Sequence, residues 1–431
     1  MEAHNQAARV LRSLVLPIYI PMICLATGMA APTPGFPQYL TGLGATVALS
    51  GLIVSLRGVG NIVSDIPGGV LVQRIGARRV IIACFGLSAI TALIIAWSTA
   101  FWLIGLAKAV MGFANAVLTL GMMAYVRRTV AAEHRGRALS FAGGSLRVGM
   151  LVGPLVGGFL AERFAVPAAF QFQAAVTVAG LLLTAVGMKP PPRAGLEAED
   201  GSGDSERGTA AATAQAAGPM QAGAITRLRA GLRGQGFKLA TVGFSIFTLM
   251  LLRAARQIIM PLWGDSLGMS PATIGQIMSV SAAVELLIFI PAGFIMDGAG
   301  RKVAASLCIG VFSAGVMLLP TSGGVVGFLI LGLVIGIGNG FGSGINMTIG
   351  TDLAPDEAIG EFLGLWRLFG DVGAAIGPFI VGAVAAALTL PTALLVTGGI
   401  GVVGTMVMAF VAPETREPSR ATQPTGGNRH Q

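Results

Sequence analysis

Long apolar runs recur along the whole chain, separated by short connections that hold most of the charged residues. A run of about 20 or more apolar residues can cross ~30 Å of hydrocarbon as a helix, which satisfies its own backbone polar groups. The first run lacks the cleavage-site pattern of a secretory signal, so we expect it to be retained. The pattern predicts twelve transmembrane helices, over residues 13–33, 46–73, 80–99, 101–126, 138–161, 167–188, 239–263, 271–296, 303–320, 323–350, 361–386 and 391–411.

Composition supports a membrane class. Apolar residues make up 54% of the 431 residues, charged residues only 11%, and the mean hydropathy is +0.78. One soluble core could not bury so much apolar surface. We therefore predict an all-α membrane protein.

Cations gather in alternate connections, together with the chain ends and the central linker. The positive-inside rule assigns those connections to the cytoplasm, and twelve crossings place both termini there. The net charge of +9 is then mainly a topology signal rather than a nucleic-acid surface, which would need a soluble basic domain. We expect no nucleic-acid partner. The cations concerned include Arg74, Arg78, Arg79, Arg127, Arg128, Arg135, Arg137, Arg301 and Lys302.

Residues 189–237 change to Pro, Gly, Ala, Ser and charge, a composition that cannot bury enough apolar surface to order itself. Their later part, Ile225 to Phe237, is either a solvated linker or a short basic helix on the cytoplasmic leaflet. The predicted organisation is a six-helix bundle over 1–188, a largely disordered linker over 189–237, a second bundle over 238–412 and a disordered tail over 413–431.

The two halves repeat one another at a constant offset of 224 residues, as Gly69 and Gly293 illustrate. A run of matches without gaps indicates an internal duplication. Two related bundles suit a transporter in which one half rocks against the other around a central site. Further matches are Gly76 with Gly300, Arg78 with Lys302, Asn115 with Asn339, Gly149 with Gly373, Gly153 with Gly377, and Pro154 with Pro378.

With these features the chain resembles the major facilitator superfamily across both halves. That family carries G-x-x-x-D-R/K-x-G-R/K-R/K between helices 2 and 3, echoed between helices 8 and 9. The second copy here fits fully, whereas the first has Gln73 in place of the acid. The resemblance implies a latch of the outward-open state in the first copy, which we expect to be weakened. The matching residues are Gly69, Arg74, Gly76, Arg78 and Arg79, then Gly293, Asp297, Gly300, Arg301 and Lys302.

Helix 5 holds GMLVGPLVGG, from Gly149 to Gly158. It resembles the G-x-x-x-G-P-x-x-G-G element of drug:proton antiporters. Its repeat in helix 11 includes Gly377 and Pro378. Small residues four apart permit close helix packing, and proline permits a kink, so these residues are either gate elements or packing elements.

Helix 4 holds KAVMGFAN from Lys108 to Asn115. It resembles the family's R-x-x-x-G element, whose arginine is implied in proton transfer. Lysine keeps the positive charge but loses the planar guanidinium.

Ionisable residues inside the spans are candidate functional groups, because each is costly if it faces lipid. Helix neighbours in the family imply two pairs across the halves, Asp65 with Arg367 and Arg147 with Glu285. A carboxylate that loses its cation in a poorly solvated site takes up a proton more readily. Glu285 is our first candidate for proton coupling, followed by Asp371 and Asp65, and a permanent salt bridge is the alternative, favoured for Arg367 with Asp371.

The sequence is compatible with two classes of substrate. Drug-like amphipathic compounds would find Met and Phe walls and the polar positions Asn115 and Asn339. An organic anion would find an excess of cations at Arg57, Lys108, Arg253 and Arg256.

Catalytic chemistry finds little support. The three histidines lie near the termini or in a connection, the three cysteines are scattered, and no phosphate-binding G-x-x-x-x-G-K-S/T loop occurs. We expect no enzyme activity, metal or cofactor.

A non-transporting membrane receptor or sensor remains the alternative from a different class. The preferred prediction is a monomeric twelve-helix secondary transporter of the cytoplasmic membrane, which exchanges protons for small amphipathic molecules.

Overall fold

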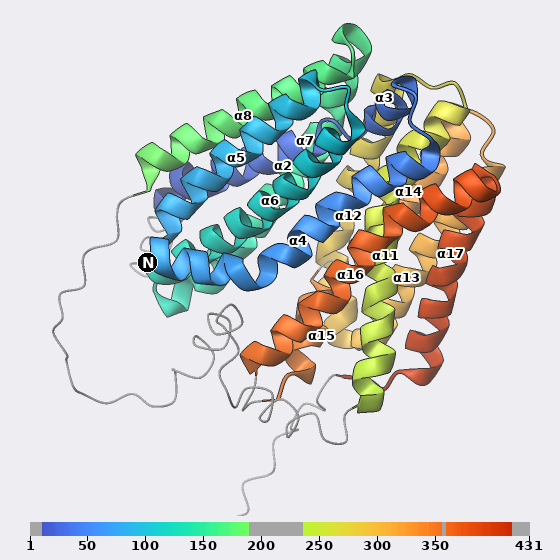
Figure 1. Ribbon diagram of the computed structural model, residues 1–431. Coiled ribbons are helices and arrows are strands. Elements are labelled where there is room, and N and C mark those ends of the chain that lie inside the picture. Colours follow the sequence, from blue (N-terminus) through green and yellow to red (C-terminus); the bar gives the residue numbers. More distant parts are fainter. Residues whose placement is uncertain (1–10, 189–235, 343, 356–358, 416–431) are drawn as a thin grey trace, which may run out of the picture.

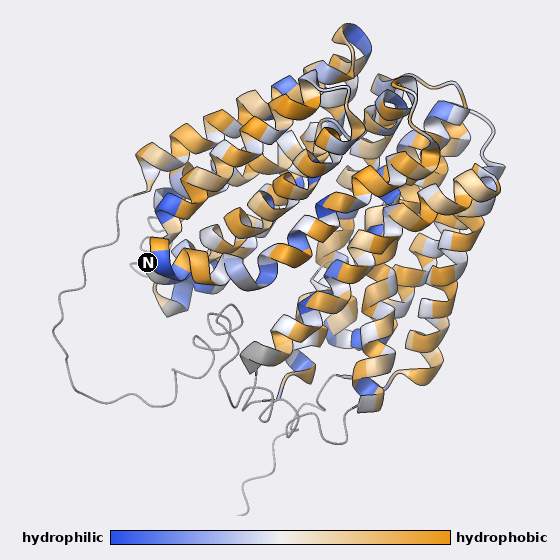
Figure 2. Cartoon of the chain, viewed as in Figure 1, coloured by the Kyte–Doolittle hydropathy of each residue, from blue (hydrophilic) through white to orange (hydrophobic). Residues whose placement is uncertain are grey.

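The chain folds into helices packed as two bundles, with no strand among the described residues. The structure is a computed structural model that describes residues 11–188, 236–342, 344–355 and 359–415. Within these residues, eleven helices are long and apolar enough to cross a membrane, and the shorter apolar helix Val15–Ala30 occupies the place of the first predicted span. In Figure 2, most of each bundle helix is orange, the colour of hydrophobic residues. The predicted all-α membrane fold is confirmed.

The first bundle begins with a π-helical turn that continues into α2. Its helices are α2 (Ile20–Ala30), α3 (Phe36–Gly42), α4 (Val47–Ile75), α5 (Ala77–Trp97), α6 (Phe101–Thr129), α7 (Ala132–Phe164) and α8 (Val166–Gly187).

The second bundle repeats this order. Its helices are α11 (Gly236–Ser266), α12 (Pro271–Gly298), α13 (Arg301–Leu318), α14 (Val325–Phe341), α15 (Ile345–Leu353), α16 (Ile359–Ala387) and α17 (Leu390–Met406). Most of the predicted linker and tail lies outside the described residues, including 225–235 of the segment Ile225 to Phe237, whose last two residues begin α11.

The tenth predicted span is wrong in one respect, because two helices replace the single helix over 323–350. α14 ends at Phe341 and α15 begins at Ile345. Gly344 has φ +83°, a left-handed conformation that only glycine adopts readily. The glycine-rich sequence here therefore breaks the helix.

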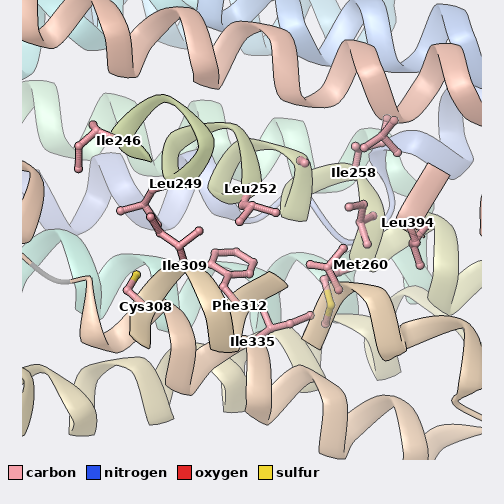
Figure 3. Close-up of a cluster of buried hydrophobic side chains, with 14 of the residues drawn as sticks. Ile246, Leu249, Leu252, Ile258, Met260, Cys308, Ile309, Phe312, Ile335 and Leu394 are labelled. Carbon is pink, nitrogen blue, oxygen red and sulfur yellow. The ribbon is translucent and has the colours of Figure 1, made fainter. Parts of the chain in front are cut away.

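Each bundle has its own apolar core. In the second bundle, Leu249 and Leu252 of α11 lie toward Ile309 and Phe312 of α13, as Figure 3 shows. Separate cores allow each bundle to move as a body.

The bundles touch through two equivalent helix pairs, α4 with α16 and α7 with α12. Gly51 lies against Pro378 and Gly382, and Gly275 lies in the same way against Pro154 and Gly158. These contacts lie toward the end that carries α3, which we call the α3 end. The opposite end, where α8 finishes and α11 begins, we call the linker end. Figure 1 shows α4 and α16 diverging toward the linker end, so the bundles meet at the α3 end.

In the repeated glycine–proline elements, some residues contact their own bundle and others contact the opposite bundle. Gly149 and Gly153 pack against α2 of their own bundle, and Gly377 packs against α11. Of the two predicted roles, these contacts support close helix packing, and the contacts lie within each bundle. Pro154 and Pro378 do face the opposite bundle.

Gly275→Leu is expected to disfavour closure at the α3 end. A Cβ at Gly275 would already overlap the Pro154 carbonyl group, and the leucine would force α7 and α12 apart. In a variant without Cys24, Cys84 and Cys308, we would place a reporter cysteine at Thr33 and apply a membrane-impermeant thiol reagent from the α3 side. Labelling should rise several-fold. Gly399→Leu is the control, because a Cβ there meets nothing within 4 Å. Unchanged labelling in Gly275→Leu would contradict the closure.

Candidate functional site: ionisable groups between and within the bundles

One ion pair joins the bundles across α4 and α16. Arg367 Nε lies 3.1 Å from Asp65 Oδ1 and 3.3 Å from Asp371 Oδ2. The predicted pair of Asp65 with Arg367 is confirmed. Because Asp371 is one turn from Arg367 on the same helix, that second pair stays within one bundle. The two carboxyl groups are close enough to interact with each other, so a single guanidinium group serves two acids.

Arg147 occupies the equivalent place between α7 and α12. Its guanidinium group lies 4.1 Å from the centre of the Phe289 ring. Arg147 is the repeat partner of Asp371, and Phe289 is the repeat partner of Asp65. The predicted ion pair with Glu285 is wrong in this structure, although the two charges interact at longer range.

Glu285 instead pairs within its own bundle. Its Oε2 lies 3.3 Å from Arg256 Nη1. Arg256 Nη2 also donates to Ser281 Oγ at 3.1 Å. Arg256 therefore links α11 to α12. Because Arg256 already pairs with Glu285, Arg147 does not form that ion pair.

Arg253 binds the broken tenth span. Its Nε donates to Asn339 Oδ1 at 2.6 Å, and its Nη2 donates to the carbonyl groups of Asn339 at 3.4 Å and Gly342 at 3.0 Å. A cation at a helix C-terminus satisfies carbonyl groups that lack helical partners. Arg253 and Asn339, both predicted to line the substrate cavity, are thus brought together. Their contact caps the end of α14.

Asn115 does not share the surroundings of its repeat partner Asn339. It is buried, and its Oδ1 accepts from Ser88 Oγ at 3.0 Å. Its Nδ2 is buried without a hydrogen-bond partner. Asn115 belongs to α6, and its side chain is directed toward α5.

Arg57 and Lys108 line a cavity with a volume of about 30 Å³, near the α3 end. Lys108 Nζ lies 4.0 Å from the centre of the Phe36 ring and 5.1 Å from that of Phe170. Arg57 Nη2 lies 3.9 Å from Met29 Sδ. Gln257 of the second bundle completes the polar lining. The cavity lies between the bundles, and two cationic side chains line it.

The second copy of the loop motif forms a cluster of ion pairs and hydrogen bonds within the second bundle, at the linker end. Arg301 pairs with Asp297 at 3.5 Å and with Asp352 at 3.1 Å. Gly300 has φ +105°, which the turn into α13 requires. Glu414 accepts from the backbone N–H groups of Arg301 and Lys302 at 3.0 and 3.2 Å, a stabilising place for an anion.

Glu414 belongs to the predicted tail over 413–431, of which the structure describes residues 413–415. Neither Glu414 nor Asp352 was a predicted site residue. Because their partners lie more than fifty residues away in the chain, no local motif indicates them.

The first copy of the motif keeps the turn but not the acid. Gly76 has φ +92°, and Arg78 Nη2 donates to the Ala185 carbonyl group at 2.8 Å. Arg74 and Gln73 are exposed near the end of α4. The repeat position of Arg301 is Ala77, so this copy lacks both members of the Asp297–Arg301 pair.

Gln73→Asp is expected to shift the population toward the state closed at the linker end. In the state closed at the linker end, a carboxylate that meets a helix N-terminus of the other bundle would gain roughly 0.3–1 kcal/mol, which corresponds to about a two- to fivefold shift. The Thr33 reporter cysteine should then react more from the α3 side and less from the linker side. Gln73→Asn provides the uncharged control. Equal accessibility in Gln73→Asp and the parent on both sides would contradict the prediction.

Metal binding has no support among the described residues, where no three His, Cys, Asp or Glu side chains gather as a potential site.

Comparisons with known proteins agree with this architecture. The Major Facilitator Superfamily matches residues 18–252 and 242–430. "Multidrug resistance protein MdtG" of Proteus mirabilis is 26% identical over 42% of this chain and 46% of its own length. "Probable anion transporter 6" of Oryza sativa subsp. japonica is 28% identical over 36% of each chain.

A solved D-xylose-proton symporter shares the fold with a TM-score of 0.71, at 16% identity over 94% of this chain and 98% of its own. The chain spans less than half the length of the curated relatives described above. The chain belongs to the Major Facilitator Superfamily and resembles its drug:proton antiporters.

Proposed function

We propose that this protein is a proton-coupled secondary transporter that exports small amphipathic compounds by alternating access. It would lie in the cytoplasmic membrane with both termini and the linker end in the cytoplasm. The pseudo-symmetric bundles, with their contacts toward the α3 end, support a rocking movement. The name of the Proteus mirabilis relative supports export of drug-like molecules.

The observation that carries proton coupling is the bridge between Asp65 and Arg367. These residues belong to different bundles, so relative movement of the bundles must alter their contact. The pairs Arg367–Asp371 and Arg256–Glu285 each lie within one bundle. Rigid-body rocking leaves both of them intact.

Asp65 is therefore the proton carrier in this proposal, ahead of Glu285. A shift of α16 along α4 during rocking would carry Arg367 away with Asp371 and leave Asp65 on α4 without a cation. An acid left in that position favours its protonated form. When the bundles return, Arg367 favours the ionised form and the proton leaves.

The order of these events gives inward proton movement, and we infer export from the name of the Proteus mirabilis relative. In this structure the linker ends are apart and Asp65 is paired. With the linker end in the cytoplasm, the proton is released inward as the cytoplasmic side opens. Substrate would then leave in the opposite direction.

Transport can be tested in proteoliposomes with two radiolabelled probes, ethidium as an amphipathic cation and 2-naphthoate as an amphipathic anion. An imposed pH gradient should drive accumulation of a transported probe against its gradient, and nigericin should abolish that accumulation. Counterflow with unlabelled probe separates transport from binding. Absence of both activities for both probes would overturn the proposal.

Transport of a small organic anion is the second candidate function. The two cations beside the cavity, Arg57 and Lys108, favour it. The name of the Oryza sativa relative, an anion transporter, supports it further.

A further inference from the structure

The charges around the cavity near the α3 end are not balanced. Among the described residues, neither Arg57 nor Lys108 takes part in an ion pair, whereas Arg256, Arg301 and Arg367 each do. Arg57 and Lys108 are also close enough to repel each other. Two uncompensated cations in the membrane interior are costly unless an anion joins them.

The internal repeat shows which charge is missing. At an offset of 224, Glu285 matches Asn61, so the first bundle has an amide where the second has a carboxylate. Arg57 matches Ser281, the residue that binds Arg256. The second bundle therefore carries both a cation and its acid, and the first carries cations with no equivalent acid.

Close helix packing holds the two cations together. A Cβ at Gly112 would overlap the backbone carbonyl group of Arg57, and one at Gly60 would overlap that of Ala109. These glycines let α4 and α6 approach within backbone contact. Lys108 is thereby held beside Arg57, with its ammonium group over two aromatic rings.

The rest of the lining favours a ligand with an apolar body. Met29, Phe36 and Val54 supply apolar surface, while Thr33 and Gln257 supply hydrogen-bonding groups. An inorganic anion would gain nothing from the apolar side chains. The resting volume of about 30 Å³ has room for little more than a water molecule, so a larger ligand must enter as the bundles move.

We propose that Arg57 and Lys108 form the anion-binding subsite of the transport cavity and that the substrate is an amphipathic organic anion with a carboxylate-like group. This inference rests on the proposed transport function and specifies its substrate class. The carboxylate takes the place that Glu285 has in the second bundle. The apolar part of the substrate lies against Met29 and Phe36.

Binding of 2-naphthoate to the purified full-length protein tests the subsite without requiring transport. Isothermal titration should detect 2-naphthoate, while its neutral isostere 2-naphthamide should bind at least tenfold more weakly. Asn61→Glu supplies an internal carboxylate one turn from Arg57 and should weaken 2-naphthoate binding at least tenfold. Asn61→Gln, the uncharged control, should bind as the parent does. Lys108→Met should also weaken binding at least tenfold.

Three results would overturn the subsite: no binding of 2-naphthoate, equal binding of the amide, or equal 2-naphthoate binding by Asn61→Glu and Asn61→Gln. Inorganic phosphate that binds as tightly as 2-naphthoate would overturn the amphipathic class. Normal binding without flux driven by a pH gradient would instead overturn proton-coupled transport and leave the subsite intact.

Discussion

Asp65→Asn is expected to abolish accumulation of a transported probe driven by a pH gradient while leaving counterflow largely intact. Asparagine cannot exchange a proton, and Arg367 keeps a partner in Asp371 at 3.3 Å. The bundles can then still rock around bound substrate, because counterflow needs no net proton movement. The measurement compares uphill uptake and counterflow in the same proteoliposomes.

Two other variants make this prediction specific. Glu285→Gln should retain uphill uptake, since its pair with Arg256 lies within the second bundle. Asp371→Asn should retain it in part, because Asp65 still meets Arg367 across the bundles. Normal uphill uptake by Asp65→Asn would refute its role. Loss in Glu285→Gln alone would restore the assignment that the sequence favoured.

Glu285→Gln is expected to have its main effect on stability. Glutamine leaves the largely buried Arg256 without an opposite charge, and the loss of one partner from such a pair costs on the order of 3 kcal/mol. The melting temperature of the purified protein should fall by several degrees. Glu133→Gln, at an exposed position near the start of α7, should leave it unchanged.

The double variant Arg256→Gln with Glu285→Gln separates pairing from packing. Removal of both charges should recover part of the stability, because no unpaired charge remains. A melting temperature in Glu285→Gln equal to that of the parent would show that the ion pair contributes nothing to stability.

Local patterns predicted what depends on hydropathy and on the repeat. Span lengths, the loop motifs and the duplication are written in consecutive residues, so helix ends differ from prediction by only a few residues in most cases. The pair of Asp65 with Arg367 was also predicted, because the resemblance supplied the neighbours of each helix. The break at Gly344 was missed, since a run of glycines inside an apolar span is equally typical of close packing.

Several partners of the charged residues could not be predicted from the sequence, because they depend on the direction in which each side chain points. Glu285 was predicted to pair with Arg147, but α11 brings Arg256 within 3.3 Å of Glu285. Arg253 looked like a cavity residue until the break in the tenth span offered it carbonyl groups. Gly149 and Gly153 looked like gate residues until α2 proved to cover them.

The sequence by itself determined the membrane class, the helix order and the duplicated plan, because burial in lipid and covalent repetition act through composition and spacing. Only the tertiary structure decided which ionisable residues were paired, because a pair forms where two helices bring charges together. Arg253 and Arg256 were thereby assigned to packing, Asp65 to the boundary between bundles, and Arg57 with Lys108 to a cavity between the bundles.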